Sequence, residues 1–315
     1  MTVGSASGAR LAAAAQSVGR WLGSWAVLES LVMRREAGDD TATDGEHVNA
    51  LALELAGSAE ADGSWNGSVL VTSESLHLLA DLGVAAVEAG RAGSTWLSAR
   101  MTEAAEDAAG CRPELHVLGL CVHGRGGFIE AGPAEGRGFG RELSTGGQFG
   151  TARSACFGVS CHALGSVLRW GVGAPAERWV ESLARVLPFL DPSSSPDVDL
   201  ASYACAVSAL ATGESEAGRA AAADGARQLA SLQRGDGSWP GVDVFHVLWA
   251  LLGAAGSGAA AAGASIARAA DLLASQLGAD GSWGRQTGPA RTLTGWRALR
   301  YAAARAGAGP AGEAR

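Results

Sequence analysis

Asp236-Gly237-Ser238-Trp239 and its two copies, at residues 62–65 and 280–283, indicate how the chain folds. Each copy follows an apolar stretch in which Leu and Ala recur at intervals of three and four residues, which is the spacing of one helical face. Asp-Gly is a frequent tight-turn pair, because Gly accepts the positive φ that other residues avoid. A second apolar stretch follows each copy. The sequence therefore predicts a repeating unit of two helices joined by an Asp-Gly turn.

Weaker copies of this unit, without the tetrapeptide, occur at residues 113–171 and 177–213, and residues 20–35 add at least one more helix. No stretch alternates between apolar and polar residues over the length of a strand. Repeats of this length either stack into an open solenoid or close into a ring. The abundance of Ala and of Gly, which numbers 46, lets helices approach closely and favours closure. We therefore expect an all-α fold, a single α/α barrel (toroid) of about five to six helical hairpins.

The expected domain organisation is a single α/α-barrel domain over residues 1–315, with the repeats at about 45–305. Residues 1–44 are expected to form an N-terminal helix or helices and a linker. Residues 306–315 are expected to be a flexible tail.

Composition excludes several classes of function. The net charge of -8 argues against a nucleic-acid partner, which requires a basic face. Lys is absent, which excludes a Schiff-base or P-loop lysine. Five Cys without regular spacing are typical of a reducing compartment. No stretch is apolar enough for a transmembrane helix. We therefore expect a cytoplasmic protein.

Acidic residues begin the second helices of two neighbouring repeats. Asp197 and Asp199 precede one of these helices, and Asp243 and His246 begin the next. In a ring, both sets would open on the same rim. Two neighbouring carboxylates do not easily ionise together, and a nearby His tunes them further, so this group is a candidate acid site. The alternative is that the aspartates are helix N-caps, and that His246 is an ordinary buried residue.

Three consecutive stretches resemble a known superfamily. They are PDVDLASYACAVSALATG (196–213), QLASLQRGDGSW (228–239) and DVFHVLWALLG (243–253). Together they resemble the terpenoid cyclases and prenyltransferases, and most closely the class II cyclases of the squalene-hopene type. That family carries glutamine-tryptophan repeats and an acidic motif. Leu200 stands where the motif has its third Asp.

The resemblance implies an enzyme of natural-product biosynthesis that cyclises an isoprenoid substrate after protonating it. Asp199 would donate the proton, and Asp197 and His246 would tune it. No cofactor is expected, apart from Mg²⁺ if the substrate is a diphosphate. Class II cyclases usually form the active site between two barrels. This chain has residues for one, so a homodimer or a partner barrel stays open.

Aromatic residues on the second helices are the expected substrate contacts, because electron-rich ring faces stabilise cations. The alternative for each of them is ordinary core packing. The five residues are Phe157, Tyr203, Phe245, Trp249 and Trp296. The Gly-rich stretch 128–150, with Arg137 and Arg141, is either a lid or anion contact, or simply an excursion between helices.

Three alternative functions remain open. The same segment resembles the β subunits of zinc protein prenyltransferases, which would make Asp197, Asp199 and His246 zinc ligands. Lanthionine cyclases, a third toroid family, bind zinc through Cys and Cys-His pairs, to which Cys121 and Cys161-His162 are faintly similar. The last alternative, which Leu200 favours, is a non-catalytic barrel that binds an apolar ligand or a partner.

Overall fold

The computed structural model describes residues 3–23, 27–39, 41–83, 87–106, 112, 117–120, 143–171, 174–195, 198–284 and 287–307. Within these ranges the chain forms twelve α-helices, one 3-10 helix and no strand. The predicted all-α class is therefore confirmed.

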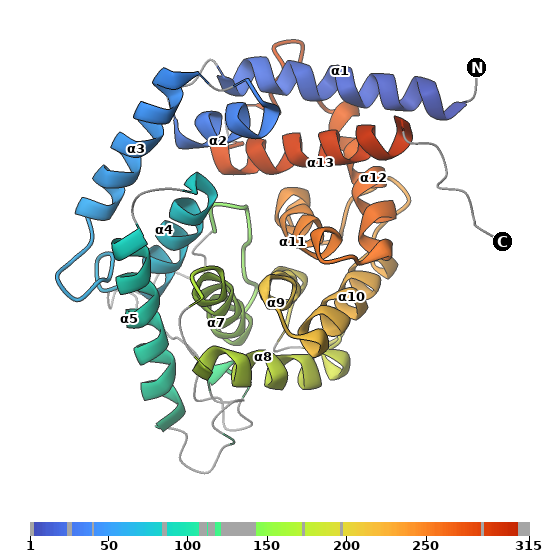
Figure 1. The fold of residues 1–315 in the computed structure, drawn as a ribbon. Coiled ribbons are helices and arrows are strands. Elements are labelled where there is room, and N and C mark those ends of the chain that lie inside the picture. The colour runs from blue at the N-terminus through green and yellow to red at the C-terminus, as the bar shows by residue number, and fades with distance from the viewer. Residues whose placement is uncertain are drawn as a thin grey trace.

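The helices follow one another in pairs, and in each pair an inner helix follows an outer one (Figure 1). The outer helices are α1 (Val3–Gly23), α3 (Ala42–Gly57), α5 (Val87–Glu106), α8 (Ala174–Val186), α10 (Glu216–Ser231) and α12 (Ala260–Ser275). The inner helices are α2 (Leu28–Ala37), α4 (Val69–Leu82), α7 (Ala152–Arg169), α9 (Leu200–Thr212), α11 (Val244–Gly256) and α13 (Pro289–Gly307). The 3-10 helix η1 (Leu187–Phe189) follows α8 directly.

The inner helices contact one another in chain order, and the contacts return to their starting point. Each inner helix contacts the next, and α13 contacts both α2 and α1. Figure 1 shows α7, α9 and α11 near the centre of the molecule, with α3, α5, α8, α10 and α12 around them. This order of contacts is compatible with the predicted α/α barrel. The boundaries predicted for the single domain, its linker and its tail stay predictions.

Each Asp-Gly-Ser-Trp turn binds the preceding outer helix through its tryptophan. The indole Nε1–H of Trp65, Trp239 and Trp283 donates to the carbonyl oxygen ten residues earlier, at 2.9, 2.7 and 2.8 Å. These carbonyls lie in the last turns of α3, α10 and α12, where carbonyls lack partners within the helix. In each copy, the Asp accepts bonds from the N–H and the hydroxyl of the Ser two positions later. The tetrapeptide is therefore a structural turn.

The glycines of these turns lie against the next outer helix. Gly63, Gly237 and Gly281 have φ values of 90°, 93° and 83°. A Cβ on each would lie 2.8, 2.5 and 2.5 Å from a backbone atom of α5, α12 and α1, respectively. For Gly281 that atom is the carbonyl oxygen of Ser17. The last repeat therefore packs against the first helix as earlier repeats pack against their successors.

None of the described helices combines the length and the apolar character that crossing a membrane requires.

Candidate functional site

Asp199 and Asp243 are the N-caps of α9 and α11. Oδ1 of Asp199 accepts the backbone N–H of Ser202 at 2.8 Å, and the Ser202 hydroxyl in turn accepts the N–H of Asp199. Oδ1 of Asp243 accepts the N–H of Phe245 at 2.8 Å. Ser68 and Thr151 cap α4 and α7 in the same way. The structure thus shows the capping role of both aspartates, whereas Asp197 lies outside the described residues.

Residues 143–150, which we name the bridging segment, connect three inner helices. The N–H of Ser144 donates to Oε1 of Glu74 in α4 at 2.7 Å. The Thr145 hydroxyl lies 2.8 Å from Nδ1 of His246 in α11. The N–H of Gly150 donates to Oδ2 of Asp199 at 2.7 Å. The two caps predicted to share a rim therefore meet this segment, since Gly146 also packs against Asp243.

Glycine is required where the bridging segment crosses His246. A Cβ on Gly147 would lie 2.7 Å from Cε1 of the imidazole and 2.9 Å from both ring nitrogens. Gly146, with φ of 96°, would place a Cβ 2.8 Å from Oδ2 of Asp243. The segment can therefore approach this closely only without side chains at these two positions.

His246 is fully buried, and both of its ring nitrogens have partners other than Asp199. The ring Nε2 lies 2.9 Å from the carbonyl oxygen of Ala201, so it carries the proton and donates. Nδ1 then accepts the hydroxyl of Thr145. Burial lowers the pKa of His246 to about 4, although the Ala201 carbonyl and the charge of Asp199 oppose the shift. His246 is therefore a neutral residue that joins the bridging segment to α9.

A cavity of about 260 Å³ lies beside this segment, between α2, α4, α7, α11 and α13. Its apolar wall includes Val32, Val71, Leu78, Trp249 and Leu293. Its polar wall includes Glu29, Glu74, His77, His162 and Thr145. Ligand pockets usually measure about 300–1,000 Å³, so this cavity suits a small molecule.

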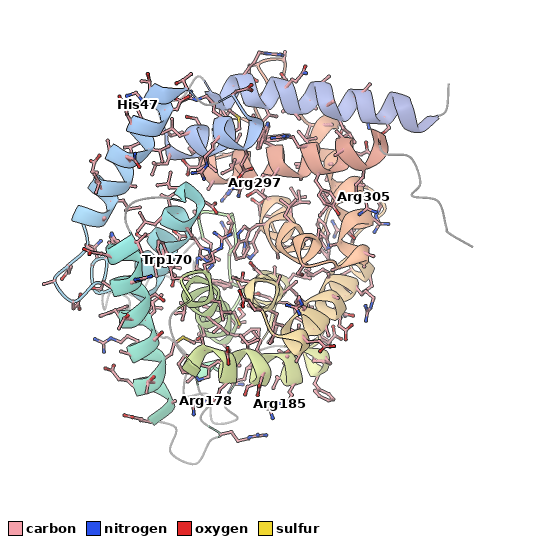
Figure 2. All side chains as sticks on the ribbon, in the orientation of Figure 1. His47, Trp170, Arg178, Arg185, Arg297 and Arg305 are labelled. Atoms are coloured by element: carbon pink, nitrogen blue, oxygen red, sulfur yellow. The ribbon has the colours of Figure 1, made fainter. Side chains whose placement is uncertain are left out.

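An ion-pair cluster lies at the other end of the cavity. Arg169 contacts Oδ1 of Asp81 at 2.8 Å, and Arg297 contacts Oδ2 at 3.4 Å and also pairs with Glu36. Figure 2 shows Arg297 on the inner side of α13. Glu74 and Asp81 are seven residues apart on α4, which is about 10 Å at 1.5 Å per residue. The cavity therefore extends along α4 from the bridging segment to this cluster.

Burial shifts the pKa values of four titratable groups of the cavity in the direction that favours their uncharged forms. Burial raises the pKa of both Glu29 and Glu74, and for Glu29 the negative charge of Asp81 adds to the rise. Burial lowers the pKa of His77 to about 3 and that of His162 well below its usual value. Shifted pKa values of this kind cluster at functional sites.

Of the five aromatic residues expected to contact substrate, Trp249 lines this cavity. Phe157 is fully buried in the core, and the Phe245 ring packs edge-on against that of Trp283 at 5.2 Å. Burial raises the pKa of Tyr203 to about 12, and its hydroxyl lies against α10.

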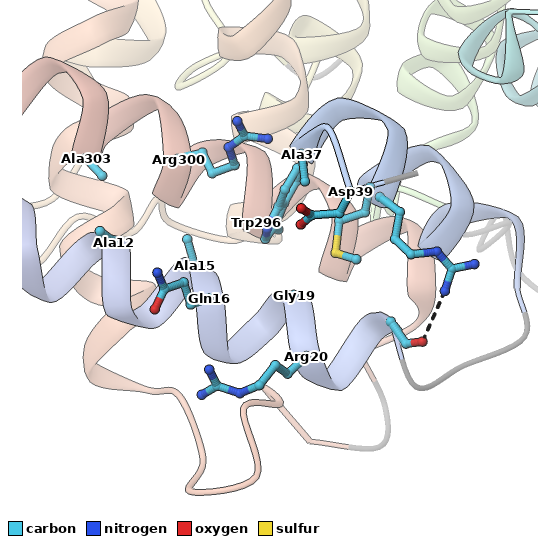
Figure 3. Close-up of a pocket in the computed structure, with 13 residues that line it drawn as sticks. Ala12, Ala15, Gln16, Gly19, Arg20, Ala37, Asp39, Trp296, Arg300 and Ala303 are labelled. Atoms are coloured by element: carbon cyan, nitrogen blue, oxygen red, sulfur yellow. Dashed lines mark hydrogen bonds between the residues drawn. The ribbon is translucent and has the colours of Figure 1, made fainter. Parts of the chain in front are cut away.

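Trp296 lines a different groove, of about 600 Å³, between α1, α2 and α13 (Figure 3). The guanidinium of Arg300 lies 4.7 Å from the centre of the Trp296 ring. Small residues such as Gly19 and Ala303 form much of the wall. Among the described residues that line this groove there is no histidine, and its one acid, Asp39, is exposed.

The residues predicted as zinc ligands in the lanthionine-cyclase alternative do not form one site among the described residues. Cys121, like Arg137 and Arg141, lies outside the described residues. Burial raises the pKa of the Cys161 thiol well above its usual value, and His162 faces the central cavity. Within the part of the chain that the structure describes, no three His, Cys, Asp or Glu side chains are arranged to hold a metal ion.

The sequence analysis did not identify Glu74 and His77, the carboxyl group and the imidazole of α4. Glu74 and His77 are three residues apart within an apolar helix, so they lie on one face. This spacing of three residues is the feature of the sequence that could have identified the pair.

Comparison of the chain with family models, with curated proteins and with solved structures finds no match.

Proposed function

We propose that this protein is an enzyme of the class II terpene cyclase type, which protonates an isoprenoid alkene in its central cavity. The observation that carries the proposal is the position of the Glu74 carboxyl group in the cavity. This carboxyl group lines the cavity, and burial raises its pKa. A raised pKa brings a carboxyl group closer to the value that suits a general acid near neutral pH.

Glu74 replaces Asp199 as the proposed proton donor. Asp199 does not line the cavity, and its two oxygens accept backbone N–H groups of Ser202 and Gly150. In this proposal Asp199 and His246 act as positioning residues, because both hold the bridging segment whose Ser144 binds Glu74.

The proposed reaction is a net isomerisation. The O–H bond of Glu74 breaks, its proton adds to one alkene carbon, and the adjacent carbon becomes a cation that a second double bond attacks. Loss of a proton from a neighbouring carbon to the ionised form of Glu29 ends the sequence. Exchange with solvent then restores both carboxyl groups.

Two features of the cavity support this reaction. The Trp249 ring lies at the cavity wall, where its face stabilises positive charge. The apolar side chains of the wall offer a surface to the hydrocarbon part of the substrate. A cavity of about 260 Å³ favours a short isoprenoid.

The test is incubation of the protein in deuterated water with isoprenoid alcohols and diphosphates of ten and fifteen carbons, with and without Mg²⁺. Mass spectrometry of the products is expected to show one carbon-bound deuterium for each turnover. The rate is expected to fall as pH rises through the raised pKa of Glu74. Products without deuterium would contradict protonation as the first step.

Glu74→Gln is expected to lose turnover at least about 100-fold, because the amide cannot donate the proton. Glu54→Gln, at an exposed position of α3, is the matched control and is expected to keep the wild-type rate. Helical circular dichroism shows whether each variant folds. A folded Glu74→Gln protein with the wild-type rate would contradict the proposal.

A further inference from the structure

His77 and His162 line the cavity, and their four ring nitrogens are buried without a hydrogen-bond partner among the described residues, although the backbone carbonyl of His162 lies near enough to His77 to act on its pKa. His162 is 3% exposed, and the two ring centroids are 4.4 Å apart. Buried polar atoms in folded proteins almost always have partners. These nitrogens therefore indicate that a polar group occupies the cavity.

Neighbouring protein groups already have other partners. Glu74 accepts the N–H of Ser144, and Arg169 pairs with Asp81. The Trp249 ring contacts both imidazoles, with centroids at 5.9 and 5.6 Å, without a hydrogen bond to either. The missing partner therefore comes from outside the described residues.

The chemistry of the rings restricts that partner. A neutral imidazole offers one N–H donor and one acceptor nitrogen. Burial and the charge of Arg169 keep His77 neutral, because both lower its pKa. A hydroxyl group can accept from one ring and donate to the other, and a carbonyl oxygen can accept from both. A hydrocarbon satisfies neither ring.

We propose that His77 and His162 bind an uncharged oxygen group of the substrate, a hydroxyl or a carbonyl. The inference rests on the proposed function, in that it takes the same cavity as the substrate site. Carboxyl groups and guanidinium groups both line the cavity, so its wall does not select a ligand of either charge. The substrate is thus an oxygenated isoprenoid rather than a hydrocarbon.

The position of His77 on α4 also indicates how far the bound substrate oxygen lies from Glu74. Glu74 and His77 are three residues apart on α4, so their Cβ atoms lie about 5–6 Å apart. The alkene that Glu74 protonates therefore lies within about one helical turn of the bound oxygen.

The test compares geraniol with 2,6-dimethylocta-2,6-diene, which has the same carbon skeleton without the hydroxyl. Both are titrated into Glu74→Gln protein, which is not expected to turn them over. Geraniol is expected to bind on the order of tenfold more tightly, the contribution of about one hydrogen bond. In protein labelled with ¹⁵N-histidine, geraniol is expected to shift the nitrogen resonances of His77 and His162.

The variants His77→Phe and His162→Phe, each combined with Glu74→Gln, are expected to lose the preference for geraniol. His47→Phe in the same background is the matched control, because His47 is exposed on the outer helix α3 (Figure 2). If a Phe variant fails to fold, the resonances of His77 and His162 in the Glu74→Gln protein still show whether geraniol binds beside these rings.

Equal affinity for the two compounds, absence of geraniol binding, or ring resonances that do not move would overturn this inference. Selective binding of geraniol without deuterium incorporation in the wild-type protein would overturn the proposed function and leave the oxygen site standing. The two proposals therefore fail by different results.

Discussion

The Thr145 hydroxyl and Nδ1 of His246 are hydrogen-bonded at 2.8 Å across 101 positions of sequence, and both side chains are buried. The bond holds the bridging segment against the first turn of α11. Nε2 of His246 donates to the carbonyl oxygen of Ala201, so neither ring nitrogen bonds to Asp199. The His is thus part of the support of the cavity rather than of an acid pair.

Thr145→Val is expected to lower the free energy of unfolding by about 1–3 kcal/mol, because it leaves Nδ1 of His246 buried without a partner. Urea denaturation measures the change. Thr43→Val, at an exposed position of α3, is the control and is expected to change stability by less than about 0.5 kcal/mol. Equal stability of the two variants would contradict the role given to this bond.

Asp199→Asn is expected to keep the cap of α9 and to lose the bond from Gly150, because Asn caps helices but its amide nitrogen cannot accept a hydrogen bond. Turnover is expected to persist, because Glu74 is the proposed acid. Asp199→Ala is expected to lose about 1–2 kcal/mol, since it removes the cap and the acceptor for Gly150. Thermal denaturation and the product assay measure the two properties. A stable Asp199→Asn protein without turnover would return the acid role to Asp199.

Gly281→Ala is expected to destabilise the protein more than Gly284→Ala. The two glycines have φ values of 83° and 91°, so an added Cβ strains the backbone at both. A Cβ on Gly281 also meets the Ser17 carbonyl oxygen, whereas one on Gly284 meets nothing within 4 Å. The difference, about 1–3 kcal/mol by chemical denaturation, measures the packing of the last repeat against α1. Equal losses would show that this contact contributes nothing.

His77 is expected to make stability depend on pH in mildly acidic solution. Burial lowers its pKa to about 3 in the folded protein, below the usual 6.5, so the unfolded chain binds the proton more readily. Stability therefore falls as pH decreases from 6.5 toward 3, by about 3 kcal/mol at pH 4.5. His77→Phe is expected to remove this part of the dependence. Glu29 and Glu74 act with the opposite sign but are present in both proteins, so their effect largely cancels in the comparison.

Denaturation of wild type, His77→Phe and His47→Phe at pH 7 and at pH 4.5 makes the measurement. His47→Phe is expected to follow the wild type, since it changes an exposed residue. A His77→Phe protein that loses as much stability as the wild type between the two pH values would contradict a neutral His77 with buried ring nitrogens.

The helix pairs could be predicted from sequence because their determinants are local. Apolar spacing marks the helices, and Asp236-Gly237 specifies a turn whose glycine has a positive φ. Asp199 carried a local ambiguity, because the same residue before a helix suits a cap and an acid. Its contacts with Ser202 and Gly150 show the cap.

By itself, the sequence determined the all-α class, the two-helix unit and the turns that join its members, since each depends on residues a few positions apart. Only the tertiary structure decided where the cavity lies and what it contains. Glu74 and His77 on α4 meet His162 on α7 and Trp249 on α11 because contacts between the inner helices bring their faces together. Burial then raises the pKa of Glu74 and lowers those of His77 and His162, and burial depends on residues far away in the chain.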